Sequence, residues 1–283
     1  MNMTLRRLFG MAIVGLAVFT GPGCRRPGGD GGDDATSKHL LLTGSSTVAP
    51  LAADLAAAYE EEYPEVRIDV QMGGSSRGIA DARSGLADIG MASRALKDSE
   101  ADLLYHTVAM DGICMVVHAS NAVSALTDGQ IKAIYTGAVT NWKDVGGEDA
   151  EITVVNKAEG RSTLELFLHY FGLEAAAIEA DVVIGDNQQG IKTVAGNPHA
   201  IGYVSIGTAE YEVGQGTPLR LLPVGGVEAS VANVRNKTFP LSRPLNFVTA
   251  AAPEGLAADF LAYAQSGAAA ELIGRHYFVP LSR

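Results

Sequence analysis

The chain has 283 residues, of which 47% are hydrophobic, and its formal net charge is −11. This length and composition are sufficient for the cores of one or two globular domains. The negative charge argues against broad contacts with nucleic acid, so any bound anion requires a local group of positive charge and hydrogen-bond donors. The two cysteines and six histidines show no metal-binding spacing, and neither a metal nor a cofactor is expected.

The first 23 residues have the pattern of a signal peptide. Arg6-Arg7 precedes an apolar stretch, Leu8–Phe19, that is too short for a clear membrane span. The arginine pair fits both a general secretory signal and a twin-arginine signal. Cys24 follows Gly21–Gly23, a sequence similar to the cleavage box of bacterial lipoproteins, and is the expected lipidation site. Plain secretion with an unmodified cysteine is the alternative.

Residues 24–37 are polar and rich in glycine, so we expect a flexible tether without a fold of its own. A lipid at Cys24 followed by this tether would hold a soluble domain at a membrane surface. The expected location is therefore the periplasm or another extracytoplasmic space, with the chain anchored to a membrane as a lipoprotein.

From Lys38 onward, predicted strands and helices alternate, which indicates an α/β fold. The predicted strands are 39–42, 66–72, 87–91, 152–156, 182–185, 200–205, 219–222 and 245–249. Residues 107–118 form a long apolar run in which a turn is expected at Asp111-Gly112. The predicted helices are 49–62, 79–84, 126–135, 164–171, 189–195, 255–266 and 268–277.

Three small polar loops each connect a strand to a helix: Thr43–Thr47, Gly73–Gly78 and Glu159–Thr163. The first N–H groups of a helix lack partners and carry partial positive charge, so such loops favour a small anion. Simple helix capping is the alternative for Ser45–Thr47. If the chain forms two lobes, the two early loops and the late loop face each other across a cleft, where ligands of open α/β sheets bind.

Hydroxyl groups and arginines of these loops, and of the Ser93-Arg94 pair, are suitable donors to an oxyanion. The candidates are Ser46, Thr47, Ser75, Ser93, Arg94, Arg161, Ser162 and Thr163. An arginine at a helix start costs about 0.3–1 kcal/mol, so Arg161 favours a local anion, although solvated surface roles are the alternative for both arginines. No Gly-Lys-Ser/Thr sequence is present in the loops, which disfavours nucleotide binding.

Six segments of the chain resemble those of a known protein family and occur in the same order as in that family. They are Gly44–Pro50, Gly73–Gly78, Ala87–Arg94, Asp111–Ile113, Ile134–Gly147 and Ala200–Ser205. With these segments the chain resembles the periplasmic phosphate-binding proteins of bacterial phosphate ABC importers, the PstS type. The resemblance implies the two-lobe periplasmic binding protein fold of type II, with a ligand cleft between lobes and two crossing strands as the hinge. It implies one lobe of residues 38–113 plus 244–283 and another of residues 114–243.

The resemblance also implies the function. The protein would capture inorganic phosphate, perform no chemistry, act as a monomer and deliver the anion to ABC transporter permease subunits, without nucleic-acid partners. The family's binding residues correspond to Thr47 and its neighbours, Ser75, Ser93-Arg94 and Ser162-Thr163.

This sequence departs from the family at two places. Some members have an aspartate where Arg94 stands, and many have an arginine where Lys157 stands, so Arg161 could supply the missing charge. An aspartate would select a protonated anion, and Asp88, Asp111 and Glu159 are its candidate substitutes.

Three alternatives stay open. The first is a binding protein for another oxyanion, sulfate or molybdate, and the second is a phosphate sensor or adhesion module. The third is a serine hydrolase, because Gly74–Gly78 also fits the Gly-x-Ser-x-Gly pattern with Ser76 as the nucleophile.

Overall fold

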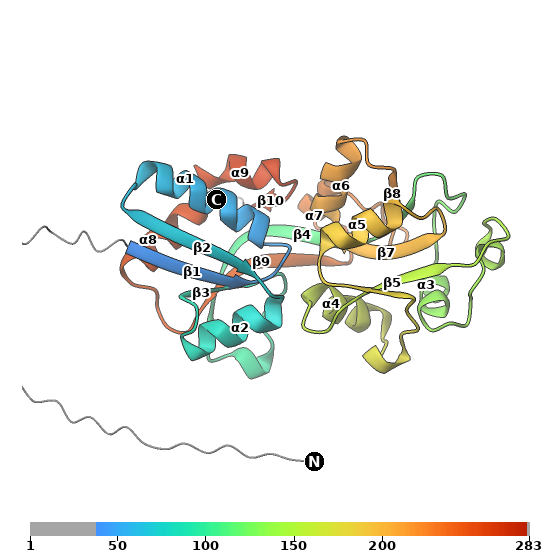
Figure 1. Ribbon diagram of the computed structural model, residues 1–283, viewed down its shortest axis with the longest axis horizontal. Helices are drawn as coiled ribbons and strands as arrows, with labels where there is room; N and C mark the ends of the chain where they lie inside the picture. Colours follow the sequence, from blue (N-terminus) through green and yellow to red (C-terminus); the bar gives the residue numbers. More distant parts are fainter. Residues whose placement is uncertain (1–37, 282–283) are drawn as a thin grey trace, which may run out of the picture. The chain divides into compact units, whose positions relative to one another are not determined.

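The computed structural model describes residues 38–281, in which strands and helices alternate along the chain as predicted (Figure 1). The signal peptide, the tether and the lipidation of Cys24 fall outside the described residues and stay predictions. Between residues 38 and 281, no helix has both the length and the apolar character needed to cross a membrane.

The strands are β1 (Lys38–Gly44), β2 (Val66–Met72), β3 (Ile89–Ala92), β4 (Leu104–His118), β5 (Thr153–Lys157), β6 (Val182–Ile184), β7 (Ala200–Ser205), β8 (Leu219–Leu222), β9 (Ser242–Thr249) and β10 (Val279–Pro280). The helices are α1 (Ala49–Glu62), α2 (Ser75–Ser84), α3 (Asp128–Tyr135), α4 (Ser162–Phe171), α5 (Asn187–Ala195), α6 (Ile206–Gly214), α7 (Val231–Arg235), α8 (Gly255–Ala264) and α9 (Ala269–Arg275). Short 3-10 helices lie at Asp98–Glu100, Trp142–Val145 and Ala175–Ala177.

The strands pair in the order β2-β1-β3-β9-β4-β7-β5-β6, and β8 and β10 also pair with β4. β1 is parallel to β2 and β3, and β5 is parallel to β6 and β7. β4 and β9 are antiparallel to each other and lie between these two parallel groups. They are the two crossing strands that the resemblance implies. The turn predicted at Asp111-Gly112 is wrong, because both residues pair with β9 inside the continuous strand β4.

Two large hydrophobic cores lie on either side of the crossing strands, and a small third cluster includes Ile79 and Val248. The first core includes Phe247 and the buried hydrophobic residues of β1 and α1, and the second includes Tyr203 and the buried hydrophobic residues of α3, α4 and β5. β4 contributes Val108 to the first core and Ile113–Val117 to the second. We call the elements around these cores the first and the second lobe; the exact boundaries given above stay a prediction.

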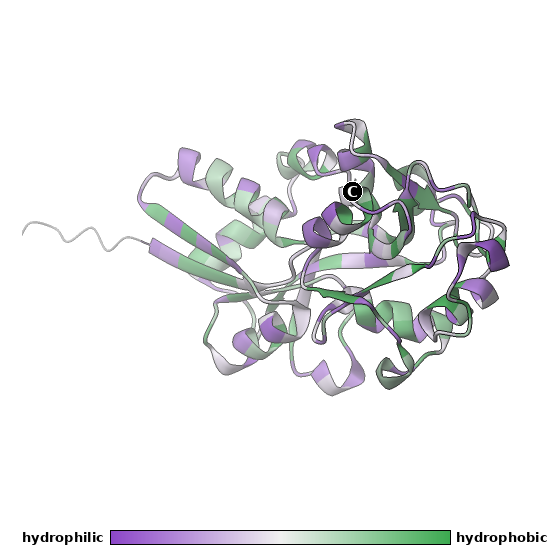
Figure 2. Ribbon diagram, turned by 45° about the vertical axis from the view of Figure 1, so that its right-hand side comes forward, coloured by the Kyte–Doolittle hydropathy of each residue, from purple (hydrophilic) through white to green (hydrophobic). Residues whose placement is uncertain are grey.

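Helices cover the sheet of each lobe with their apolar sides. Strand β2 alternates between hydrophobic and hydrophilic residues, β1 carries three consecutive leucines, and the helices carry both kinds on different sides (Figure 2). In α1 the buried residues include Leu51, Leu55 and Tyr59, which recur at helical spacing. This amphipathic pattern explains why strand and helix periodicity located most elements correctly.

Two glycines allow α2 to lie close against the ends of β1 and β3. A Cβ atom at Gly78 would lie 2.5 Å from the backbone oxygen of Thr43, and one at Gly44 (φ +134°) would lie 2.3 Å from a backbone oxygen of β3. Any larger residue would push the helix away from the strands. The close approach places Ser75, the first residue of α2, where its Oγ accepts a hydrogen bond from Ser93 N at 3.2 Å.

Three helices begin earlier than predicted, and the difference concerns the polar loops. α2 begins at Ser75, α4 at Ser162 and α5 at Asn187, so residues predicted as loop form first helical turns. Small polar residues favour caps and turns, which hides a helix start in the sequence. The consequence is that the hydroxyl groups of Ser75 and Ser162 lie in the first turns of α2 and α4.

Candidate functional site

Four buried serine hydroxyl groups meet where the two lobes touch. Ser45, Ser75 and Ser93 belong to the first lobe and Ser162 to the second, and each is at most 2% exposed. Ser45 Oγ donates to Ser93 Oγ at 3.0 Å, Ser93 Oγ donates to Ser162 Oγ at 3.3 Å, and Ser162 Oγ donates to Ser75 Oγ. The starts of α2 and α4 therefore face the same place from opposite lobes.

Ser45 has a second role at the start of α1. Its Oγ accepts hydrogen bonds from Thr47 N at 3.2 Å and from Val48 N at 3.3 Å. The capping alternative considered for this loop therefore applies to Ser45 itself, while the hydroxyl group of Thr47 points elsewhere.

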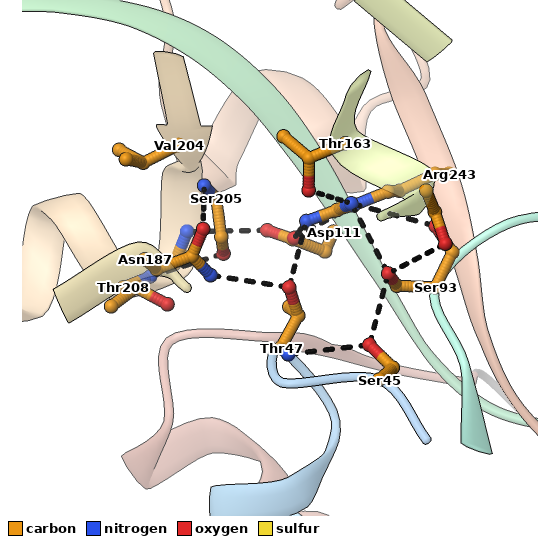
Figure 3. Close-up of polar contacts among 12 residues, drawn as sticks. Ser45, Thr47, Ser93, Asp111, Thr163, Asn187, Val204, Ser205, Thr208 and Arg243 are labelled. Carbon is orange, nitrogen blue, oxygen red and sulfur yellow. Dashed lines mark hydrogen bonds and ion pairs between the residues drawn. The ribbon is translucent and has the colours of Figure 1, made fainter. Parts of the chain in front are cut away.

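Arg243 lies at the centre of the contacts between the lobes (Figure 3). Its side chain is fully buried. Its Nη1 donates to Thr163 Oγ1 at 3.1 Å and to Ser93 Oγ at 3.3 Å, and its Nη2 donates to Thr47 Oγ1 at 3.3 Å. One guanidinium group thus connects hydroxyls of both lobes.

Asp111 orients this guanidinium group from behind. Asp111 on β4 and Arg243 on β9 are register partners in the sheet, and Asp111 Oδ2 accepts from Arg243 Nε at 3.1 Å and from Nη2 at 2.9 Å. The other oxygen, Oδ1, accepts from Gly207 N at 3.2 Å at the start of α6. A buried pair of this kind must be well hydrogen-bonded, and here both oxygens have partners.

Asn187, the first residue of α5, extends the set of donors. Its Nδ2 donates to Thr47 Oγ1 at 3.1 Å, and its Oδ1 accepts from Lys157 Nζ at 3.2 Å. Lys157 is 3% exposed and its Nζ also donates to the backbone oxygen of Asp186 at 2.8 Å. Burial, with a smaller effect of the positive charges of Arg243 and Arg161, lowers the pKa of Lys157 from 10.5 to about 7, although Asp186 opposes the shift.

The structure brings together five of the residues that the sequence nominated. They contribute hydroxyl groups to the contacts around Arg243 or to the serine cluster: Thr47, Ser75, Ser93, Ser162 and Thr163. Ser46 is half-buried, and no hydrogen bond of its side chain is found among the described residues.

Arg94 is not in contact with the hydroxyl cluster, unlike the sequence-based expectation. Its Nη1 and Nη2 donate to the two carboxylate oxygens of Glu100 at 2.7 and 2.9 Å, and its Nε lies 2.9 Å from Glu165 Oε2. Burial alone would lower the pKa of Arg94, but these two carboxylates raise it above its ordinary value. The charge of Arg94 is therefore balanced by neighbouring acids.

Arg161 is half-buried at the start of α4 and has no ion pair within residues 38–281. A Cβ atom at Gly74 would lie 3.1 Å from Arg161 Cδ, so the arginine stem lies against the first lobe. A Cβ atom at Gly185 would lie 3.4 Å from its Nη2. The side chain therefore lies beside the contact between the lobes with its charge available.

Of the three acids considered as substitutes for the family aspartate, only Asp111 is at the site. Asp88 accepts a hydrogen bond from Leu41 N at 2.7 Å within the first lobe, and Glu159 is exposed. Ser76 Oγ donates to Glu165 Oε1 at 3.0 Å, and no histidine partner of this hydroxyl is found in the described chain. Within residues 38–281, no group of three or more His, Cys, Asp or Glu side chains is placed to hold a metal ion.

Sequence reasoning missed Arg243 and Asn187. Both lie outside the glycine–serine loops, Arg243 on a crossing strand and Asn187 after β6. The one sequence signal for Arg243 is a charged residue at the beginning of an apolar strand, Pro244–Thr249. Its partner, Asp111, is 132 positions away in the chain, and only the strand register brings them together.

A family model described as the PBP superfamily domain matches residues 31–268 of this chain. The chain belongs to the PBP superfamily. The resemblance to phosphate-binding proteins is also confirmed: the phosphate-binding protein PstS of Bacillus subtilis is 29% identical over 239 residues, which cover 83% of this chain and 78% of that protein. PstS of Staphylococcus epidermidis is 27% identical over 252 residues, 84% of this chain and 77% of that protein.

Solved structures agree with the two-lobe type II fold of this PBP superfamily member. A protein from Clostridium perfringens, described as a phosphate ABC transporter substrate-binding protein with bound phosphate, superposes with a TM-score of 0.80 at 33% identity and covers 87% of this chain and 100% of its own. An ABC-type phosphate transport receptor from Vibrio cholerae has a TM-score of 0.69 at 30% identity and covers 86% of this chain and 100% of its own.

Proposed function

We propose that this PBP superfamily member is the extracytoplasmic binding protein that captures inorganic phosphate for an ABC importer. The observation that carries the proposal is the buried guanidinium group of Arg243, which contacts Thr47 and Ser93 of the first lobe and Thr163 of the second. Such convergent donors from both lobes suit a tetrahedral oxyanion. The phosphate-binding relatives at 29 to 33% identity support the same ligand.

The proposed site consists of the sequence-nominated donors together with Arg243. The hydroxyl groups of Thr47, Ser75, Ser93, Ser162 and Thr163 now donate to or accept from each other and Arg243, and each can rotate to donate to an anion oxygen. Ser46 and Arg161 adjoin this group and stay candidates. Arg94 acts at most indirectly, because its guanidinium is held by Glu100 and Glu165.

Charge balance explains why the anion would be attracted against the negative net charge. Asp111 already neutralises Arg243, so the added negative charge of phosphate must be offset by other groups. Arg161 is the nearby cation, Lys157 with its pKa of about 7 carries a partial charge at neutral pH, and the starts of α2 and α4 add N–H dipoles. We expect a dissociation constant of about 1 µM or tighter, near −8 kcal/mol.

The proposed mechanism is capture by closure without chemical conversion. The anion binds donors of one lobe, recruits those of the other and shifts the protein toward the closed form, to the extent that it binds this form more tightly. A permease would recognise the closed protein. Lipid anchoring through Cys24, an extracytoplasmic location and a monomeric state are parts of the proposal that rest on the sequence pattern and the family.

Calorimetric titration of the purified protein with phosphate and with sulfate, at pH 5 and pH 8, tests the function. Tight binding of phosphate with sulfate ignored supports a receptor that selects phosphate. Equal binding of both anions means that the site selects its ligand by charge alone and not by protonation. Absence of binding to either anion contradicts the proposed function.

A further inference from the structure

Beside the proposed anion site, a carboxylate of the second lobe contacts three polar groups of the first. Glu165 lies on α4, three residues after Ser162 and on the same side of that helix. Its Oε1 accepts from Ser76 Oγ at 3.0 Å, and its Oε2 lies 2.9 Å from Arg94 Nε and 2.9 Å from Lys97 Nζ. A backbone hydrogen bond from Ser76 N to the oxygen of Gly160, at 3.3 Å, adjoins these contacts.

Arg94 does not need Glu165 to balance its charge. Glu100, in the same lobe as Arg94, accepts from both Nη1 and Nη2, and the guanidinium lowers the pKa of this carboxyl. This bidentate pair is complete within the first lobe. The contact with Glu165 is therefore an additional ion pair that exists only while the lobes are together.

The ion pair between Arg94 and Glu165 is strengthened by its burial. The side chain of Arg94 is 5% exposed and that of Glu165 is 24% exposed, so water screens this pair less than a surface pair. Lys97 is more exposed, at 54%, and contributes a cation at the rim.

We propose that Glu165 is a closing residue, which binds Arg94, Lys97 and Ser76 across the lobes and stabilises the closed form without touching the anion. This inference rests on the proposed anion capture for its effect on affinity. Because apparent affinity falls with the fraction of the binding-competent form, loss of a contact specific to that form weakens binding at a distance. The resemblance assigned Arg94 to the anion; here Arg94 acts as a positioning residue that receives Glu165.

The test is Glu165→Gln, which keeps the shape of the side chain and removes its charge. We expect the dissociation constant for phosphate to rise about three- to tenfold. The wild-type affinity should also decrease more steeply with sodium chloride concentration than that of the variant, because only the wild type has this ion pair to screen. Small-angle scattering without phosphate should give a larger radius of gyration for the variant.

The matched control is Asp102→Asn. Asp102 forms a bidentate ion pair with Arg83 at 2.7 and 2.8 Å, entirely within the first lobe, so its loss should change neither affinity nor salt dependence. Lys97→Met, at an exposed position, removes a second member of the contact. Combined with Glu165→Gln it should weaken binding by less than the product of the two single effects.

The outcomes separate this inference from the proposed function. Phosphate binding by the wild type together with an unchanged or tighter dissociation constant in Glu165→Gln overturns the closing role and leaves anion capture standing. If the wild type binds no phosphate, anion capture fails, and the scattering comparison still decides whether Glu165 holds the lobes together. Should Glu165→Gln not fold, an unchanged affinity and salt dependence of Lys97→Met would overturn the proposal.

Discussion

Arg243 and Asp111 set the chemistry of the proposed site at the level of single residues. The guanidinium group needs its Nε and Nη2 for Asp111 and still presents Nη1 and Nη2 to three hydroxyls. Only a planar group with five donors in fixed directions can serve both purposes. The buried carboxylate keeps the guanidinium in place, and the hydroxyls that it contacts can rotate to donate hydrogen bonds to an anion.

We therefore predict that Arg243→Lys raises the dissociation constant for phosphate at least tenfold, about 1.4 kcal/mol. The ammonium group keeps a positive charge beside Asp111, so the buried acid is not left unpaired, but it cannot reach the hydroxyls of both lobes. Calorimetry of the variant measures the effect, and its melting temperature controls for folding. A dissociation constant equal to that of the wild type would remove Arg243 from the site.

Lys157 leads to a prediction about pH. The pKa of Lys157 is about 7 in the folded protein, and its ordinary value is 10.5. Between these two pH values, the folded protein therefore holds fewer protons on Lys157 than the unfolded chain does. Stability then rises with pH in that window, because the unfolded state binds more protons. The destabilising effect of Lys157 is greatest below pH 7 and is relieved as the pH increases.

The measurement is urea unfolding of the anion-free wild type and of Lys157→Met at pH 7 and pH 9. The stability of the wild type relative to the variant should increase by up to about 2 kcal/mol between the two pH values. The methionine variant supplies the baseline for all other titrating groups. A difference that stays constant would show that Lys157 keeps its ordinary pKa in the folded protein.

At the level of elements, the site depends on helices that begin at the ends of strands. α1 and α2 follow β1 and β2 in the first lobe, and α4 and α5 follow β5 and β6 in the second. The glycines at positions 44 and 78 let α2 approach β1 and β3 closely enough for Ser75 to contact Ser93. The position of the Ser75 hydroxyl group therefore depends on how the whole of α2 packs against β1 and β3.

Gly78→Ala tests this packing. Its Cβ atom would lie 2.5 Å from a backbone oxygen, so α2 must move, and we expect a loss of about 1–3 kcal/mol in stability together with weaker phosphate binding. Gly274→Ala in α9 is the control, since nothing lies within 4 Å of its Cβ position and alanine favours a helix by about 0.5–1 kcal/mol. Urea unfolding that shows no loss for Gly78→Ala would refute the close-packing argument.

The sequence allowed the elements to be predicted better than their first residues. Periodicity located β1, α1 and β7, but α2 and α4 begin at Ser75 and Ser162, inside segments that were predicted as loops. Helix α6 was not predicted. Helix α7 and strand β10 were also not predicted, because so few residues carry too weak a periodic pattern.

At the level of the whole molecule, the two lobes share two long strands and a buried polar contact. The sequence predicted the lobes and the crossing strands through its resemblance to phosphate-binding proteins, and five of the predicted hydroxyl residues do lie together. It did not indicate that Arg243 is opposite Asp111, because the register of two strands 132 residues apart depends on the packing of both lobes. For the same reason the partners of Arg94 could not be foreseen.

The central claim is that phosphate binds between the lobes at Arg243, and a crystal structure of the protein grown with phosphate tests it most directly. The account predicts one phosphate whose oxygens accept hydrogen bonds from Arg243 and from hydroxyls of both lobes, among them Thr47 and Thr163, with Glu165 still paired to Arg94. A phosphate bound elsewhere, or one that contacts Arg94 in place of Arg243, would contradict the account.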